Sequence, residues 1–206
     1  VALGHTLDDQ VESILMHLIR GSGLDGLKGM EIMSKRTLVD KRLTLFRPLL
    51  SISRETIKDY CLEQGLDPRI DSTNSSLEFT RNSLRLKLIP LLESYNPSVK
   101  KALFRLSQTV TEDVNFLEEA SENAWNLCVS NKEGILIINT EIFNDFPEAL
   151  AYRILRRGVR IVKGSPDNIS QPHLKSTLDL AKSESCNSIN LPEQIIARKM
   201  YKKLLI

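Results

Sequence analysis

Polar residues with the chemistry of a catalytic site gather near the start of the chain. His5 is followed closely by Asp8, Asp9 and Gln10, which places an imidazole, two carboxylates and an amide together. Asp9 follows Thr6 by three positions, the spacing of a capping box, and this predicts a helix with Thr6 as its N-cap. Such groups can perform acid–base chemistry, or bind phosphate through a divalent cation beside the N–H groups of the helix end. The plain alternative is that first-turn carboxylates only complement the helix dipole.

The elements that hold these residues follow from the apolar spacing. Residues 1–3 are typical of the end of a strand, and apolar residues recur every three or four positions from Val11 to Ile19. That spacing predicts an amphipathic helix after a strand and a loop, the junction at which α/β sheets bind ligands. Arg20, Gly21 and Gly23 follow the helix and form either a loop that a ligand approaches closely or an ordinary helix C-cap.

Capping residues and apolar periodicity place the remaining elements. We expect a strand at 43–46, a helix capped by Ser53 and ended by Gly65, a loop over 66–78, a helix over 80–93 stepped at Pro90, a long helix from Asn96 to 127, a strand at 134–139, helices over 147–162 and 171–183, and short strands over 188–206. The long helix would span about 45–50 Å at 1.5 Å per residue. We therefore place a domain boundary at its start, which gives domains 1–96 and 97–206.

A first pair of arginines lies on the helix predicted over 80–93. Arg81 and Arg85 are four residues apart and share a helix face, with Asn82 beside them. Two guanidinium groups in this arrangement can bind a phosphate or a carboxylate through paired hydrogen bonds. On spacing alone, a solvated or ion-paired face is the better interpretation.

A second basic group lies on the helix predicted over 147–162. It consists of Arg153, Arg156, Arg157 and Arg160, and we call it the arginine stripe. The apolar residues Leu150, Ile154, Leu155, Ile161 and Val162 are expected to form the buried side of this helix. The stripe suits a phosphate backbone such as that of RNA. Pairing with acids of the long helix, Glu122 among them, is an equally good interpretation.

Composition fits a folded domain of a reducing compartment. The chain has 206 residues, 41% of them hydrophobic, and a net charge of +2, which excludes neither nucleic acid nor small-molecule partners. Its three cysteines are far apart and form no CxxC pair, which argues against a disulfide framework and a zinc or iron–sulfur site. No signal peptide or membrane-spanning run is evident, so we expect a cytoplasmic protein without a membrane partner.

Several short motifs, in a fixed order over about a hundred residues, together resemble the tRNA(Ile)-lysidine synthetases of the PP-loop ATP pyrophosphatase superfamily. The first motifs are Gly4-His5-x-x-Asp8-Asp9-Gln10-x-Glu12 and Leu18-x-Arg20-Gly21-Ser22-Gly23-Leu24-x-Gly26-Leu27-x-Gly29-Met30. The later ones are Arg47-Pro48-Leu49-Leu50, Arg54-Glu55 with Tyr60, Asp71-Ser72-Thr73-Asn74, Thr80-Arg81-Asn82-Ser83-Leu84-Arg85, and Leu88-Ile89-Pro90 to Asn96-Pro97. The second half of the chain is similar to the substrate-specificity domain of this family, although more loosely.

One departure from the family pattern affects the expected activity. The Ser-Gly-Gly-x-Asp-Ser loop, whose backbone N–H groups hold the ATP phosphates in the family, does not occur in this sequence, which starts with Val. We therefore expect an internal portion of a larger protein, inactive by itself. The resemblance implies an α/β fold with a mostly helical remainder. In this arrangement the C-terminal half of a Rossmann-like PP-loop nucleotide-binding domain (1–96) precedes a mainly helical α+β substrate-specificity domain (97–206).

The resemblance also implies a reaction for the parent protein. ATP would adenylate the C2 oxygen of the wobble cytidine in the CAU anticodon of tRNA(Ile) and release pyrophosphate. The ε-amine of L-lysine would then displace AMP from C2 to leave lysidine. The implied catalytic residues are His5 and Asp9; ATP and lysine would bind near Arg20, Gly21 and Gly23. The tRNA or its adenylate would contact Arg81, Asn82 and Arg85. Contact of the tRNA with the arginine stripe is an expectation from the charge pattern alone. Magnesium is the expected ion, with unknown ligands.

Two other functions stay open at this level. A PP-loop enzyme that thiolates tRNA would usually need paired cysteines, and Cys61, Cys128 and Cys186 are isolated in the sequence. A non-enzymatic RNA-binding module is the other alternative. The sequence is compatible with a monomer or a homodimer.

Overall fold

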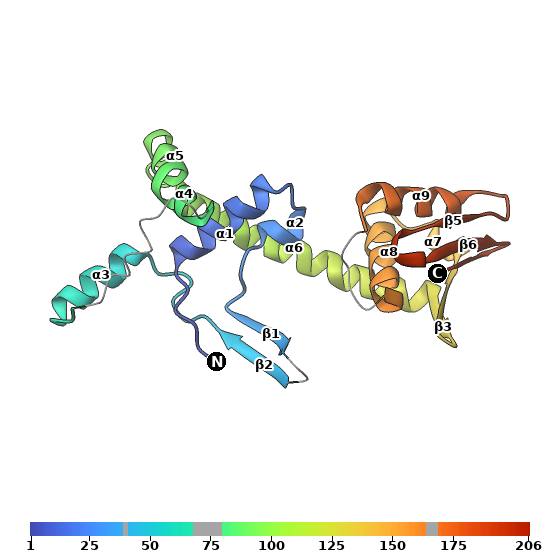
Figure 1. The fold of residues 1–206 in the computed structure, drawn as a ribbon, viewed down its shortest axis with the longest axis horizontal. Coiled ribbons are helices and arrows are strands. Elements are labelled where there is room, and N and C mark those ends of the chain that lie inside the picture. Colours follow the sequence, from blue (N-terminus) through green and yellow to red (C-terminus); the bar gives the residue numbers. More distant parts are fainter. Residues whose placement is uncertain (39–40, 68–79, 164–168) are drawn as a thin grey trace. The chain divides into compact units, whose positions relative to one another are not determined.

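Two units that differ in their cores make up the chain. A computed structural model describes residues 1–38, 41–67, 80–163 and 169–206 (Figure 1). Contacts between backbone positions divide the chain into a first unit, Val1–Val114, and a second unit, Asn115–Ile206. The predicted domain boundary between residues 96 and 97 stays a prediction.

The first unit begins with the predicted strand–loop–helix junction. Backbone hydrogen bonds join Leu3 N to the Phe46 carbonyl and Phe46 N to the Val1 carbonyl, both within 2.9 Å, and Ala2 forms a parallel bridge with Phe46. Helix α1 (Leu7–Ile19) follows with Thr6 as its N-cap and the complete capping box. The predicted order of elements at this junction is therefore confirmed, although the strand is reduced to a single bridge.

A polar β-hairpin supplies the partner of this bridge. Strands β1 (Met33–Leu38) and β2 (Lys41–Phe46) are antiparallel, with Met33 paired to Phe46. Strand β2 was predicted and β1 was not. The described side chains of β1 are exposed or half-buried, so its sequence carries no apolar alternation that would indicate a strand.

Short helices complete the first unit. Helix α2 (Leu24–Leu27) follows α1, and α3 (Arg54–Glu63) begins after the predicted cap Ser53 and ends before Gly65 at φ +63°. The helix predicted over 80–93 is α4 (Thr80–Ser83), a π-helical segment (Leu84–Leu88) and α5 (Ile89–Tyr95). The predicted step occurs in the turn before Pro90, which has no N–H to donate to the preceding turn. The predicted loop over 66–78 lies largely outside the described residues.

The long helix of the prediction is α6 (Val99–Cys128), with 30 residues. Asn96 precedes it, and its side-chain oxygen accepts a hydrogen bond of 2.9 Å from Ser98 N. The first turns of α6 contribute Leu103 and Phe104 to the apolar cluster that α1 forms with Leu84 and Ile89. This cluster packs α1 against the helices that follow it in the first unit.

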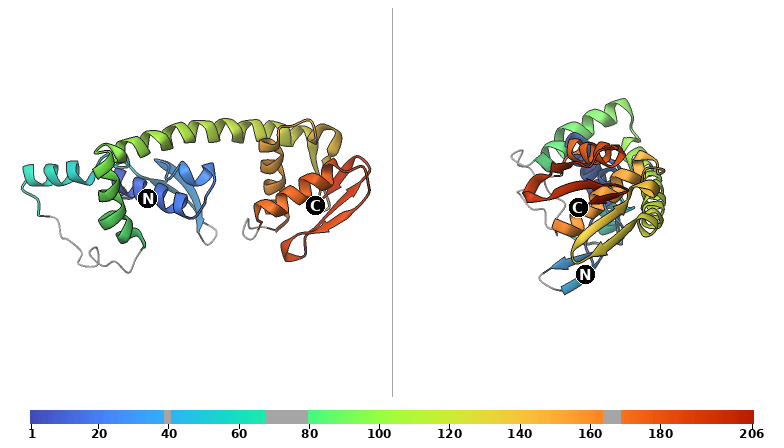
Figure 2. Two further views of the ribbon diagram at one scale, coloured as in Figure 1. Left: turned by 90° about the horizontal axis from the view of Figure 1, so that it is seen from above. Right: turned by 90° about the vertical axis from the view of Figure 1, so that its right-hand side faces the viewer.

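The second unit is an antiparallel sheet covered by helices (Figure 2). The strands are β3 (Val129–Lys132), β4 (Ile135–Asn139), β5 (Ser188–Asn190), β6 (Ile196–Met200) and β7 (Lys203–Leu205), in the spatial order β3-β4-β7-β6-β5. Helices α7 (Thr140–Phe143), α8 (Glu148–Lys163) and α9 (Gln171–Lys182), and a 3-10 turn (Pro192–Gln194), complete this unit. Of these elements, β3 and α7 were not predicted.

The core of the second unit lies between one face of the sheet and the helices. Ile138 and Leu204 from the strands pack with Ile154, Leu155 and other buried residues of the helices. The predicted buried side of α8 is correct for Ile154 and Leu155 and wrong for Ile161 and Val162, which are 48% and 39% exposed. These two residues lie in the last turn of α8, beyond the part of the helix that the core covers.

The structure confirms a mixed α/β fold with sheets and a large helical share. Over the described ranges, no helix combines the length and apolar character needed to cross a bilayer.

Candidate functional site

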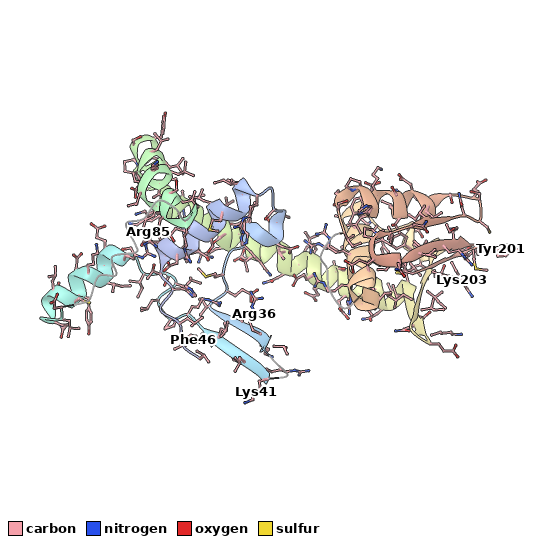
Figure 3. All side chains as sticks on the ribbon, in the orientation of Figure 1. Arg36, Lys41, Phe46, Arg85, Tyr201 and Lys203 are labelled. Carbon is pink, nitrogen blue, oxygen red and sulfur yellow. The ribbon has the colours of Figure 1, made fainter. Side chains whose placement is uncertain are left out.

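Charged side chains from four segments of the first unit meet at the start of α1. The acids are Asp8, Asp9, Glu12 and Glu93, and the bases are Arg54, Arg81, Arg85 and Lys100; together we call them the charged cluster. Four carboxylates face four cations, so the cluster has no net charge. Figure 3 shows Arg85 extending from the π-helical segment next to α1.

Glu12 is the centre of the charged cluster. Its side chain is fully buried, and it accepts hydrogen bonds from Arg54 Nη1 at 3.2 Å, Arg81 Nε at 2.6 Å and Arg85 Nε at 2.8 Å. The hydrogen bond that Arg85 donates to Glu12 is the largest cause of the raised pKa of Arg85. A buried carboxylate needs such partners, because without them its desolvation would not be compensated.

Asp9 joins the helix cap to two of these arginines. One of its oxygens accepts from Thr6 N and Thr6 Oγ1, both at 2.8 Å, and the other accepts from Arg54 Nη2 at 2.5 Å and Arg81 Nη2 at 3.0 Å. Burial is the largest influence on the pKa of Asp9 and raises it. The bonds from Thr6 and the charges of Arg54 and Arg81 together outweigh burial, so the pKa of Asp9 is lowered.

Asp8 faces a different set of donors. It accepts from the backbone N–H of Arg54 at 2.8 Å and from Lys100 Nζ at 3.1 Å, and Lys100 also contacts Glu93 at 3.0 Å. Burial again has the largest effect and raises the pKa of Asp8, but the bonds from Arg54 and Lys100 lower it overall. Asp8 and Asp9 are therefore both held as carboxylates, with their oxygens already engaged by N–H and O–H donors.

His5 lies beside the start of the helix and contacts a different arginine. Arg47 Nε donates to His5 Nδ1 at 3.2 Å, and Arg47 Nη1 donates to the Glu31 carbonyl at 2.8 Å and to Ser34 Oγ at 3.0 Å. Arg47 is buried and His5 is half-buried. Within the described residues His5 and Asp9 form no hydrogen bond or ion pair with each other, and these two predicted catalytic residues have separate partners.

The glycine-rich turn after α1 is a helix cap. Gly21 N donates to the Leu18 carbonyl at 3.0 Å and Ser22 N to the His17 carbonyl at 2.9 Å, with Gly21 at φ +74°. These are the two hydrogen bonds of a Schellman motif, with Arg20 as the C-cap. Gly23 then serves as the N-cap of α2. The turn therefore has the structural role that its sequence left open, and its role toward a ligand stays a prediction.

The turn that follows α2 is tied to α1 by Gln10. Gln10 donates to the carbonyls of Lys28 and Met30, and Met30 N donates back to Gln10 Oε1 at 2.7 Å. Gly29, at φ +66°, lies so close that an added Cβ would be 2.6 Å from the Gln10 amide nitrogen. Gln10 of the first motif is therefore a positioning residue for residues 28–30.

The structure brings Arg81 and Arg85 to the predicted catalytic segment, and Asn82 is buried beside them. Their carboxylate partner Glu12 was not among the predicted site residues, nor were Arg54, Glu93 and Lys100. One signal in the sequence could have indicated Glu12: it follows Asp8 by four positions and Asp9 by three, so all three share a helix face. The partners from other segments have no such signal, since Arg85 is 73 positions from Glu12.

The arginine stripe lies in the second unit and is divided in its contacts. Arg157 forms a salt bridge with Glu122 of α6, and its guanidinium lies 4.5 Å from the ring centroid of Trp125. Arg156 and Arg160 are exposed, whereas Arg153 is half-buried. The pairing with Glu122 was one of the two interpretations of the sequence, and it holds for Arg157.

Carboxylates such as those of Asp8 and Asp9 are possible ligands for magnesium. Over the parts of the chain that the structure describes, no group of three or more His, Cys, Asp or Glu side chains is arranged to hold a metal ion. Asp8 and Asp9 instead bind cationic side chains and N–H groups. We therefore assign no residue to that ion.

Comparison with known proteins relates the chain to a family of known description. Residues 1–92 match the family model described as a PP-loop domain, so this part of the chain is of the PP-loop class. Over almost its full length the chain is similar to proteins named tRNA(Ile)-lysidine synthase.

Three relatives illustrate the extent of the similarity. The tRNA(Ile)-lysidine synthase of Clostridium acetobutylicum is 34% identical over 98% of this chain, and that of Clostridioides difficile is 30% identical over 100%. The one from Geobacillus kaustophilus is 33% identical over 100% of the chain. The chain spans 42–44% of the length of these three relatives.

Proposed function

We propose that the protein carrying this chain modifies tRNA with ATP as co-substrate, and that it ligates L-lysine to the wobble cytidine of tRNA(Ile) through an adenylated intermediate. The observation that carries the proposal is the sequence identity of 30–34%, over 98–100% of the chain, with relatives named tRNA(Ile)-lysidine synthase. The PP-loop match over residues 1–92 supports ATP as the nucleotide.

The charged cluster supports a site for an anionic substrate. Arg81 and Arg54 keep 40% and 31% of their side-chain surface exposed while they bind Asp9 and Glu12. Guanidinium groups fixed in this way can bind a phosphate without first losing side-chain freedom. In this proposal Arg81, Asn82 and Arg85 border the adenylate, and Asp9 holds the arginines in place or receives the lysine ammonium.

The other assigned residues keep their roles as proposals. His5 contacts the reacting groups beside the start of α1, and the turn formed by Arg20, Gly21 and Gly23 borders lysine and ATP. The exposed Arg156 and Arg160 contact the tRNA backbone. We expect magnesium to accompany ATP. Its ligands would be residues other than Asp8 and Asp9, because the oxygens of these carboxylates already accept hydrogen bonds.

The thiolation alternative is not favoured by the cysteines of the structure. Burial raises the pKa of the Cys128 thiol to about 11, so Cys128 is a poor nucleophile at neutral pH. Cys61 and Cys186 are free, and no disulfide joins the three. The raised pKa therefore counts against Cys128 as a sulfur carrier.

A filter assay on the complete protein that carries this sequence tests the proposal. Labelled lysine, ATP and a tRNA(Ile) transcript with a CAU anticodon should give ATP-dependent lysine incorporation, and a transcript with a changed wobble base should give none. Asp9→Asn should abolish incorporation, whereas Asp59→Asn, on the exposed face of α3, should not. Sulfur transfer without lysine uptake, or tRNA binding without ATP turnover, would contradict the proposal in favour of the alternatives.

A further inference from the structure

The geometry points to Arg47 as a positioning residue that fixes the imidazole of His5 in its Nε2–H tautomer, so that His5 meets the substrate as a hydrogen-bond donor and not as a base. The part that concerns the substrate rests on the proposed function. The part that concerns the tautomer rests on the contacts of the first unit alone.

The contact between the two side chains determines where the proton lies. Arg47 Nε is 3.2 Å from His5 Nδ1 and donates its hydrogen to that atom. A guanidinium has donors and no acceptor, so His5 Nδ1 must supply the lone pair. In a neutral imidazole the second nitrogen then carries the proton, which makes Nε2–H the donor.

Arg47 is held firmly enough to impose this tautomer. Arg47 is only 7% exposed, and its Nη1 donates to the Glu31 carbonyl at 2.8 Å and to Ser34 Oγ at 3.0 Å. Its backbone N–H donates to the Ile32 carbonyl at 2.8 Å. The guanidinium therefore has two further acceptors and cannot turn away from His5 without losing them.

The segment that carries His5 is hydrogen-bonded to the end of β2, directly before Arg47. Phe46, the residue before Arg47, forms the parallel bridge with Ala2 and accepts a hydrogen bond of 2.8 Å from Leu3 N. Thr6, the residue after His5, is the N-cap of α1. His5 therefore lies between two anchored neighbours, with its Nδ1 edge toward Arg47.

This arrangement has a chemical consequence for the proposed reaction. A general base needs a lone pair, and the lone pair of this tautomer is at Nδ1, where Arg47 already uses it. A protonated imidazole would direct an N–H at a guanidinium, an unfavourable contact of like charges. The Nε2–H is suited instead to donate to an anionic oxygen of the substrate, as donors of oxyanion sites do.

The two other histidines of the chain provide internal references for the tautomer. His17 Nδ1 lies 2.9 Å from the Gly26 carbonyl, an acceptor, so His17 must carry its proton on Nδ1. His173 Nδ1 accepts from Ser170 N at 3.2 Å, so His173 must carry its proton on Nε2. His5 should therefore resemble His173 and differ from His17.

Nitrogen-15 NMR of the 206-residue chain tests the tautomer without any assay of activity. At mildly alkaline pH, the two-bond and three-bond correlations of the imidazole should assign Nε2–H to His5 and His173, and Nδ1–H to His17. Arg47→Gln should shift His5 toward a mixture of tautomers and leave His17 and His173 unchanged, and Arg47→Lys should keep most of the Nε2–H form. An Nδ1–H form of His5 in the unmodified chain would overturn the inference.

Two substitutions at His5 in the complete protein test its role toward the substrate. His5→Gln places an amide N–H near the position of Nε2 and should keep lysine incorporation within about tenfold, whereas His5→Asn should lose about 10²–10³-fold, the effect of removing an oxyanion donor. An equal loss in both variants would indicate a base and overturn the donor role. If the unmodified protein incorporates no lysine, the proposed function fails, and the NMR result still decides the tautomer.

Discussion

Glu12 is the residue on which the charged cluster depends most. It is fully buried and binds three arginines whose side chains are 27–40% exposed. Glu12→Gln removes the charge at almost constant volume and leaves Arg54, Arg81 and Arg85 facing one another. We expect the free energy of unfolding to fall by about 2–4 kcal/mol, somewhat less than for a fully buried ion pair because the arginines reach solvent.

Urea denaturation followed by circular dichroism measures this change. Glu63→Gln is a matched control, because Glu63 ends α3 with an exposed side chain and its replacement should cost less than about 0.5 kcal/mol. Equal effects of the two substitutions would mean that the buried carboxylate contributes nothing beyond an ordinary surface acid.

The lowered pKa of Asp9 gives a prediction with a defined pH range. A carboxyl group whose pKa is lower in the folded state stabilises the fold fully above its ordinary value of 3.8, and this stabilisation is lost as the pH falls through the folded pKa. Asp9→Asn should therefore lower the free energy of unfolding by about 1–3 kcal/mol at neutral pH. The difference from the unmodified chain should shrink as the pH approaches and passes below this ordinary value.

The measurement is a series of urea titrations of both chains from neutral to acidic pH. Asp59→Asn serves as the reference, since Asp59 is exposed on α3 and forms no ion pair with the residues that the structure describes. A destabilisation by Asp9→Asn that stays constant down to acidic pH would contradict the assigned charge interaction.

At the scale of elements, capping residues and apolar periodicity were the reliable signals. Thr6 and Ser53 each mark a helix start that the structure confirms, and Asn96 lies three residues before the start of α6. The missed elements have weak patterns: β1 and β3 present mostly exposed polar residues, and α7 has four residues. A helix cap is determined by a few neighbouring residues. A polar strand such as β1 or β3 is determined instead by the strand with which it pairs.

The candidate site could be predicted only in part for a related reason. The residues on α1 are neighbours in sequence, so their shared face follows from helix geometry. Arg47 reaches His5 from 42 positions away and Arg81 reaches Glu12 from 69. These contacts depend on how separate segments pack, which spacing within one helix does not specify.

The arginine stripe on α8 contains exposed arginines and one arginine that contacts α6. We therefore expect substitutions of the first kind to affect tRNA binding and a substitution of the second kind to affect stability. Arg156→Gln and Arg160→Gln remove exposed charges, so each should weaken tRNA binding by the complete protein and reduce the slope of log affinity against log salt by about 1. Arg157→Gln removes the contacts with Glu122 and Trp125 and should instead lower the free energy of unfolding.

Filter binding over a range of salt concentrations measures both the affinity and the slope. Lys175→Gln is the charge-matched control, because Lys175 is exposed on α9 and pairs with Asp179 of the same helix. If Lys175→Gln reduces the salt slope as much as Arg160→Gln does, the stripe has no specific role in binding.

At the scale of the whole molecule, the two apolar cores contain no common residue. The first is built around Leu7, Val11, Leu15, Leu84 and Ile89, and the second extends from Ala124 to Ile206. The chain has one tryptophan, Trp125, and it packs against the second core. Tryptophan fluorescence therefore reports on the unfolding of the second unit, whereas the imidazole signals of His5 report on the first.

This separation predicts that a cavity in one core is detected mainly by the probe of its own unit. Leu178→Ala should lower the stability measured by fluorescence by about 2–5 kcal/mol, because it removes a fully buried side chain. Leu84→Ala should leave the fluorescence transition nearly unchanged and lower the urea midpoint measured by the His5 signals. If Leu84→Ala shifts the fluorescence transition as far as Leu178→Ala does, the chain unfolds as one cooperative unit through α6, because only strong coupling along that helix would carry the loss from one core to the other.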